Sequence, residues 1–357
     1  MLFILNHKFF TELQIANIRE HLEKAQNPIF YFDNDADGLC SFLLLRRFIN
    51  RGKGVAVKSF PDLNVKYAKK AQELNADYVF VLDKPIISKE FAEEINKMGL
   101  PLVWIDHHDI PYEEIKLENF YVFNPTKNKG KDKSEEPVTF LSYNIANRKE
   151  DMWIAIMGCI ADHFLPDFTQ EFSSNYPDFW AKDIKAPFDA YYKTEIGRIA
   201  RSLGFGLKDS ISHVVQLQNF LLGCKSPSDV FSESTLNHTF RKHYEDIRKK
   251  YYNLIEKAKT KVSDKLIFFD YAGDLSMSGD LANELSYLYP NKYIAVAYKK
   301  AAISNISLRG KNIKKILDKI KKNFEDSTGG GHDDAVGARI KTSDLERFKK
   351  ELEEEIT

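Results

Sequence analysis

The first third of the chain alternates short apolar runs with amphipathic segments, and this alternation restricts the folds that it can adopt. The predicted strands are 29–32, 55–60, 77–83, 102–105 and 121–123. The helices predicted around and between them are 11–25, 38–50, 65–74 and 88–98. Strands that alternate with helices form mostly parallel sheets with helices on both faces, so we expect an α/β fold. Ligands of such sheets bind beyond the carboxyl ends of the strands.

The rest of the chain predicts two further parts. The segment 140–164 is apolar and helical, 191–262 is mostly helical in pattern, and strand–helix alternation resumes from residue 264. The expected domains are an N-terminal α/β domain over 1–190, a helical linker or insert over 191–262 and a smaller C-terminal α/β domain over 263–357. Aromatic residues are frequent from 165 to 192. They could stack on unpaired bases, but packing in a core is the favoured interpretation for most of them.

The composition excludes some classes of protein. Lysine plus arginine and aspartate plus glutamate number 52 each, so the formal net charge is zero. Any surface that binds nucleic acid must therefore be a local patch. The three cysteines show neither metal-ligand spacing nor a disulfide pattern, which is typical of a reducing compartment. No apolar run approaches the roughly 20 residues that span a bilayer, so we expect a cytoplasmic protein without a membrane partner.

Acidic residues and histidines follow several of the predicted apolar segments directly. In chain order they are Asp33, Asp35, Asp37, Asp83, Asp106, His107, His108, Asp162 and His163. The ends of parallel strands meet at one edge, where carboxylates this close raise one another's pKa or bind a cation. Oxygen and imidazole ligands without thiolate suit Mn²⁺, Mg²⁺ or Co²⁺. The number of acids favours two ions that share a carboxylate.

Some of these residues also have structural interpretations. Asp33 or Asp37 could cap the helix that follows the first strand, which is a common role of aspartate. Asp83 could be an ordinary turn residue at the end of its strand. For His163, a supporting or structural role is favoured over direct ligation of a metal.

A second group of residues lies near the carboxyl end of the chain. The segment Gly329-Gly330-Gly331-His332 predicts a glycine-rich turn whose backbone amides are open to an anion, with His332 able to contact a phosphate. The preceding predicted strand, 302–308, presents Arg309. Arginine, a glycine nest and histidine together predict a site that holds a phosphate or a carboxylate.

The order of these residues resembles the DHH phosphoesterase superfamily with its C-terminal DHHA1 domain. The matching motifs are Asp33-x-Asp35-Ala36-Asp37-Gly38, Asp83, Asp106-His107-His108, Gly158-Cys159-Ile160-Ala161-Asp162, Ser307-x-Arg309 and Gly329-Gly330-Gly331-His332. They span residues 33 to 332, which is nearly the whole chain. The Asp-x-Asp-x-Asp-Gly form is similar to RecJ-like nucleases, including archaeal ones that associate with replication or helicase proteins.

The resemblance implies an exonuclease that acts on single-stranded DNA or RNA and releases nucleoside 5′-monophosphates. Two divalent ions, with Mn²⁺ favoured over Mg²⁺ or Co²⁺, would activate the attacking water. The active site would lie in the cleft between the DHH and DHHA1 domains. The partners would be single-stranded nucleic acid or short oligonucleotides, together with a replication or helicase protein.

The resemblance also implies roles for single residues. The implied catalytic residues are Asp35, Asp83, His107 and His108. The implied metal ligands are Asp33, Asp35, Asp83, His107 and Asp162, with Asp83 bridging the ions. The implied substrate-binding residues are His108, Arg309, Gly329, Gly330, Gly331 and His332. The implied supporting residues are Asp37, Asp106 and His163, with Asp106 orienting His107.

The chain departs from the family pattern in places. Many relatives have a histidine just ahead of the first aspartate, but residues 29–32 are Ile-Phe-Tyr-Phe. This departure predicts a weaker or more exchangeable ion at Asp33. The tail Lys84-Pro85 is unusual for the second motif. Asp333-Asp334 stands where relatives often have a proline and a small residue.

Two other functions fit the same motifs. One is a phosphodiesterase or phosphatase for small substrates, such as very short RNA, cyclic dinucleotides or 3′-phosphoadenosine phosphate. The other is a replication or repair assembly protein without catalysis, and the intact set of acids argues against it. Groove length separates the exonuclease from the small-substrate enzyme, and metal binding separates both from the assembly protein.

Overall fold

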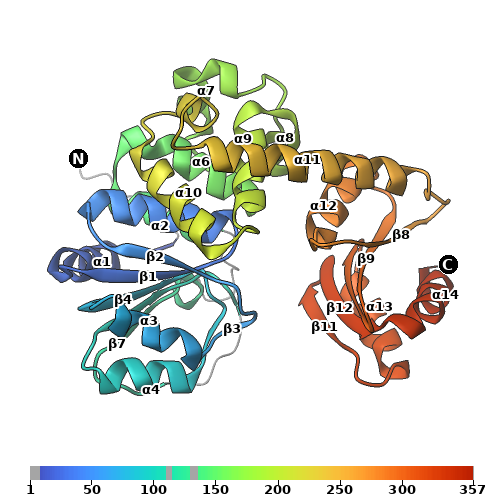
Figure 1. Cartoon of the computed structure of the whole chain (residues 1–357), viewed down its shortest axis with the longest axis horizontal. Coiled ribbons are helices and arrows are strands. Elements are labelled where there is room, and N and C mark those ends of the chain that lie inside the picture. Colours follow the sequence, from blue (N-terminus) through green and yellow to red (C-terminus); the bar gives the residue numbers. More distant parts are fainter. Residues whose placement is uncertain (1–8, 110–114, 129–135, 357) are drawn as a thin grey trace. The chain divides into compact units, whose positions relative to one another are not determined.

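Five parallel strands form the sheet of the amino-terminal part of the molecule (Figure 1). The computed structural model describes residues 9–109, 115–128 and 136–356. The sheet order is β2-β1-β4-β6-β7, so the first strand lies inside the sheet. The strand bounds are β1 Pro28–Asp33, β2 Lys53–Val57, β4 Tyr78–Leu82, β6 Leu102–Ile105 and β7 Phe120–Phe123. A separate parallel pair joins β3 (Asp62–Leu63) to β5 (Ile86–Ile87).

The two faces of this sheet bury alternate residues of each strand, as the twofold period of a strand requires. In β1, Phe30 and Phe32 belong to one core, whereas Ile29 and Tyr31 belong to the other. Both faces are therefore apolar, which explains why the strands are continuous hydrophobic runs. The α/β class and the parallel sheet with flanking helices are confirmed.

Different helices cover the two faces. Helices α3 (Ala68–Glu73) and α4 (Lys89–Lys97) pack on one core, and α1 (Glu12–Lys24) and α2 (Ala36–Ile49) contribute to the other. Two more helices pack on α2 (Figure 1), and they are α5 (Val138–Ala146) and α6 (Met152–Ala161). The single apolar helical segment expected over 140–164 is thus interrupted, because Asn147 adopts the left-handed conformation that ends α5.

The chain divides into two compact units, Met1–Tyr244 and Glu245–Thr357. Residues 191–244, which were expected to belong to a separate helical linker, are therefore part of the first unit. The helices concerned and their neighbours are α7 Thr169–Asn175, α8 Pro187–Lys193, α9 Glu195–Gly206, α10 Ile211–Gly223 and the first part of α11 (His238–Lys259). The physical reason is that apolar side chains of α9 and α10, such as Leu203 and Leu217, enter the first core.

The aromatic residues of this region mostly serve packing. Phe172 is fully buried, and partly buried rings pack against the same core. Those rings are Phe168, Tyr176, Phe179, Trp180 and Tyr191. None of the helices in the described ranges combines the length and the apolarity that a membrane span needs.

The second unit has its own sheet, with order β11-β12-β10-β9-β8. Strands β8 and β9 are parallel and the remaining pairs are antiparallel. Its strands are β8 Leu266–Ala272, β9 Tyr293–Lys300, β10 Ile303–Arg309, β11 Thr328–His332 and β12 Ala335–Lys341. Its helices are α12 Ser278–Leu288, α13 Ile313–Ile320 and α14 Leu345–Ile356. A separate apolar core that includes Leu317 and Phe348 supports this unit.

One glycine sets how closely α5 and α6 approach each other. A Cβ built on Gly158 of α6 would overlap the Thr139 side chain of α5. Thr139 in turn donates to the Asp37 carbonyl in α2 at 2.9 Å, so it has little freedom to move away. Gly204 of α9 is also helical, but a Cβ there would meet nothing within 4 Å.

We predict that Gly158→Ala lowers the free energy of unfolding by about 1–3 kcal/mol, because overpacking displaces helices that cannot separate. The matched variant Gly204→Ala should be neutral or stabilising by less than about 1 kcal/mol. Urea unfolding followed by tryptophan fluorescence measures both. Equal effects of the two variants would show that the contact with Thr139 is not tight.

Candidate metal centre

The ends of three parallel strands bring acidic residues to one edge of the first sheet. Asp33 is the last residue of β1, Asp83 follows β4, and Asp106 follows β6. The backbone continues the pairing beyond the strands, since the Asp83 amide donates to the Ile105 carbonyl at 3.1 Å. A further carboxylate comes from a helix, because Asp162 ends α6.

His107 is central to this group. Its Nε2 lies 3.5 Å from Asp83 Oδ1 and 3.8 Å from Asp162 Oδ2. Two overlapping sets of ligand atoms lie within 4.8 Å of one another, Asp83 with His107 and His108, and Asp37 with His107 and Asp162. Carboxylate oxygens and imidazole nitrogens at such spacing fit a Mn²⁺ or Mg²⁺ ion.

The ionisation of the carboxylates reflects their crowding. Burial, followed by repulsion from Asp37, Asp35 and Asp33, raises the pKa of Asp83 well above its ordinary value. Loss of hydration and then the neighbouring charges raise the pKa of Asp162 as well, and that of Asp35 to about 7. For Asp35 and Asp162, repulsion explains the raised pKa better than burial does. Asp35 is exposed and the Asp162 side chain is 40% exposed. A cation would relieve this repulsion.

Asp106 supports a histidine, but a different one from that expected. Its carboxylate accepts from the His108 backbone amide at 3.0 Å and lies 2.8 Å from His108 Nδ1. Burial would lower the pKa of His108, but the bond to Asp106 and its charge outweigh it, so the pKa is raised. Asn124, which the sequence did not single out, donates to the His108 carbonyl at 3.0 Å. Asp106 therefore orients His108 and not His107.

Two acids of the first motif cap helices. Capping of the helix after the first strand was considered for Asp33 or Asp37. Asp35, rather than Asp33 or Asp37, is the N-cap of α2 and accepts from the Gly38 amide at 2.9 Å. Buried Asp37 accepts from the Val138 and Thr139 amides at 2.9 and 2.7 Å. Asp37 thus caps α5, a helix far away in the sequence.

Asp33 is occupied by a partner that sequence reasoning did not assign. Lys84 Nζ lies 2.9 Å from Asp33 Oδ1, and the Lys84 side chain is fully buried. Asp33 and Asp35 stand in neither of the two ligand sets found among the described residues. The sequence signal was available, because Lys84-Pro85 is the unusual tail of the second motif.

Two residues of this region, Asp83 and His163, have an unusual backbone conformation. Asp83 has a φ of 59° and His163 a φ of 58°, both in the left-handed region. Such residues usually mark turns or sites held by their surroundings. The exposed His163 ring lies against Phe188, with 4.1 Å between ring centroids, which fits a supporting role.

Apart from His108, the residues expected to bind substrate lie in the second unit. Arg309 ends β10, where its Nε donates to Asn283 Oδ1 at 2.7 Å. The expected glycine-rich turn is wrong, because Gly329, Gly330 and Gly331 are part of the exposed strand β11, which pairs with β12. The two acids 333 and 334 make the turn instead.

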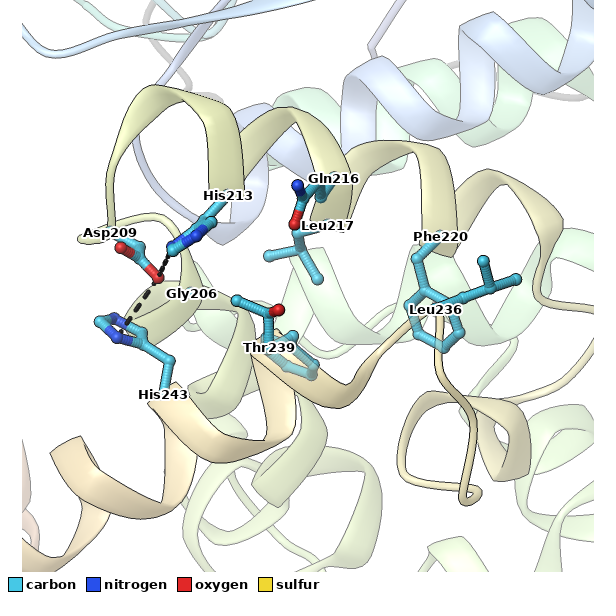
Figure 2. A pocket seen from close by; sticks show the side chains of 10 residues that line it. Gly206, Asp209, His213, Gln216, Leu217, Phe220, Leu236, Thr239 and His243 are labelled. Carbon is cyan, nitrogen blue, oxygen red and sulfur yellow. Dashed lines mark hydrogen bonds and ion pairs between the residues drawn. The ribbon is translucent and has the colours of Figure 1, made fainter.

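A second cluster of titratable groups lies in the first unit, where Figure 2 shows a pocket lined by the end of α9, one side of α10 and the start of α11. Asp209 Oδ2 lies 2.9 Å from His213 Nδ1 and 3.3 Å from His243 Nδ1. The same residue accepts from Lys58 Nζ through its carbonyl at 2.8 Å. These contacts fix helices to one another and include none of the acids of the metal centre.

Family models match the two parts of the chain that hold these residues. Residues 29–163 match the DHH family, N-terminal domain, and residues 264–357 match the DHHA1 domain. The chain contains a DHH domain followed by a DHHA1 domain. Both stand in the order that the motifs predicted, so the resemblance is confirmed. Among curated proteins, none matches the sequence.

Solved structures share the fold of the DHH–DHHA1 chain. RecJ of Thermus thermophilus in complex with Mn²⁺ has a TM-score of 0.66 at 14% identity, over 96% of this chain and 54% of that one. A manganese-bound exonuclease RecJ has a TM-score of 0.62 at 14% identity, over 96% and 93%. The pGpG-specific phosphodiesterase PggH of Vibrio cholerae has a TM-score of 0.52 at 13% identity, over 93% and 99%. This chain therefore spans about half the length of the Thermus RecJ chain.

The raised pKa values predict how metal-free stability depends on pH. The pKa of Asp35 is raised to about 7 in the folded state. In the unfolded chain the pKa of an aspartate is about 4. The folded state therefore binds more protons over this range, and its stability falls as pH rises towards 7. Mn²⁺ should raise the melting temperature more at pH 8 than at pH 5.5.

Removing one charge at the centre should separate these effects. Asp83→Asn should raise the metal-free melting temperature at pH 8, by about 2–4 °C for each kcal/mol of repulsion removed. It should also reduce the Mn²⁺ shift, since Asp83 belongs to one of the two sets of ligand atoms. The exposed control Asp178→Asn should change neither value. A Mn²⁺ shift that survives in Asp83→Asn would exclude Asp83 from the site.

Proposed function

We propose that the DHH–DHHA1 chain is a metal-dependent phosphodiesterase that degrades single-stranded nucleic acid from one end to nucleoside 5′-monophosphates. The observation that carries this proposal is the position of His107 Nε2, between Asp83 and Asp162 at the carboxyl edge of the sheet. The DHH and DHHA1 matches and the fold shared with a manganese-bound exonuclease RecJ support it.

The donor set of this edge fits a divalent metal ion. Asp83, His107 and Asp162 would hold it, with Asp37 completing the set. A bound Mn²⁺ or Mg²⁺ would polarise a phosphoryl oxygen and make a water molecule more acidic. The surrounding strand ends keep these ligands in place, because β4 and β6 pair in parallel up to the residues before Asp83 and Asp106.

His108 is suited to donate a proton to the leaving oxygen. Asp106 lies at Nδ1, so the ring presents its other nitrogen to the substrate. The raised pKa of His108 keeps the ring protonated over a wider pH range. A leaving alkoxide needs a proton at this stage, and an imidazolium supplies it near neutral pH.

Arg309 and β11 are suited to hold a phosphate of the substrate. Asn283 and the Leu308 carbonyl, at 2.7 and 2.8 Å, fix the guanidinium of Arg309. On β11, the Gly330 backbone is exposed and a Cβ there would meet nothing within 4 Å. The backbone of a nucleic-acid substrate can therefore approach it closely. His332 ends the same strand.

The first test is activity against strands of different length. With Mn²⁺, end-labelled DNA and RNA from dinucleotides to long oligomers should yield mononucleotides from one end. His107→Ala should lower kcat at least about 100-fold, because it removes the ligand shared by both sets. The exposed variant Lys97→Ala is the control. Absence of hydrolysis at every length would overturn the proposal.

The length series also tests the second candidate, a phosphodiesterase for short substrates. The observation that favours it is the shared fold with a pGpG-specific phosphodiesterase, 99% of whose length this chain covers. A rate that falls sharply beyond a few nucleotides would identify the small-substrate enzyme. A rate maintained on long strands would identify the exonuclease.

The pH dependence tests the role of His108. Asp106→Asn removes the charge that raises the pKa of His108, so the alkaline limb of the kcat–pH profile should move to lower pH by about 1 unit. The value of kcat at pH 8 should fall about 10–100-fold. A profile that keeps its alkaline limb while kcat falls would assign Asp106 a structural role only.

A further inference from the structure

Lys84 is buried and its ammonium group is held by several contacts, which is unusual for a lysine. Its side chain is fully buried, and Nζ donates to Asp33 Oδ1 and to the Ser59 carbonyl, both at 2.9 Å. The Trp104 indole donates to the Lys84 carbonyl at 2.9 Å, which holds the backbone. The Phe60 ring lies over the ammonium, with its centroid 5.6 Å from Nζ.

Such an arrangement needs a physical reason. Burying an ammonium costs several kcal/mol unless an opposite charge and hydrogen bonds compensate for it. Lysines are usually found at the surface for this reason. Here the compensating charge is Asp33, an acid of the edge that also holds Asp83, so the sequence places a fixed positive charge inside the acidic centre.

His107 can bind only one of the ions that a two-ion site would hold. The same atom, Nε2, faces both Asp83 and Asp162. A nitrogen lone pair binds one ion at a time, so His107 can serve only one ion, and any second ion would depend on the remaining carboxylates. Asp33, which would help to hold the other ion in a two-ion site, is hydrogen-bonded to Lys84 instead.

We propose that the ammonium of Lys84 takes the place of a second metal ion, so that this chain binds one divalent ion at His107 and compensates Asp33 with its own side chain. The inference rests on the metal centre of the proposed function and replaces the expectation of two ions. An ammonium neutralises charge but has no coordination sites for water. Activation of the attacking water would therefore depend on the single ion.

The test counts bound Mn²⁺ in the full chain. Calorimetric titration, with the electron paramagnetic resonance of free Mn²⁺ as a second readout, should give one ion for the native chain. Lys84→Met keeps the length of the side chain but frees Asp33, so it should bind two ions. The double variant Lys84→Met/Asp33→Asn should return to one. The exposed control Lys97→Met should stay at one.

Two bound ions in the native chain, or one in a folded Lys84→Met variant, would overturn the proposal. If Lys84→Met fails to fold, Asp33→Asn alone decides. It should keep one ion with affinity unchanged within about twofold, since Asp33 is not a ligand, and a lost ion would overturn the proposal. Nuclease activity with two bound ions would support the proposed function and overturn this inference. One bound ion without hydrolysis would support this inference and overturn the proposed function.

Discussion

Repulsion between carboxylates at one edge of a parallel sheet is the constraint on which the rest of the first unit depends. Asp35, Asp83 and Asp162 all have raised pKa values, so the fold gathers negative charge that the contact of Lys84 with Asp33 neutralises only in part. A parallel sheet makes this gathering possible, because every strand delivers its last residue to the same edge. The same crowding that should lower metal-free stability would favour the binding of a cation.

The fold distributes its acids among several uses. Asp35 and Asp37 satisfy amides at the starts of α2 and α5, and Asp106 holds an imidazole. Thr139 connects these uses, because it contacts Asp37 on one side and packs against Gly158 on the other. The position of Asp162 at the end of α6 therefore depends on packing between helices as well as on the sheet.

Much of this could be predicted from the sequence because it depends on local pattern. The apolar run 29–32 and the acids after each such run predicted the sheet and its edge. Partner choice was not accessible in the same way. The contact between Asp106 and His108 depends on the backbone path after β6, which the sequence pattern does not specify. The contact between Asp33 and Lys84 joins the ends of the neighbouring strands β1 and β4. The glycines 329–331 were expected to turn, but pairing with β12 extends them, and tertiary pairing overrides a turn preference.

The membership of residues 191–244 in the first unit could not be predicted for a related reason. Helical periodicity over 191–262 identifies amphipathic helices but does not say which core their apolar faces join. Leu203 and Leu217 join the core of the first unit, and this choice depends on surfaces that form only after folding.

The ion pair of Asp33 and Lys84 has a consequence for metal supply. A chelator can strip an ion from ligands but cannot remove a side chain, so the contact between Lys84 and Asp33 does not depend on dissolved metal. That contact is completed when the chain folds and needs nothing from solution. Lack of metal would then empty only the position at His107. The contact between Lys84 and Asp33 would stay formed, so rebinding of a single ion would restore the site.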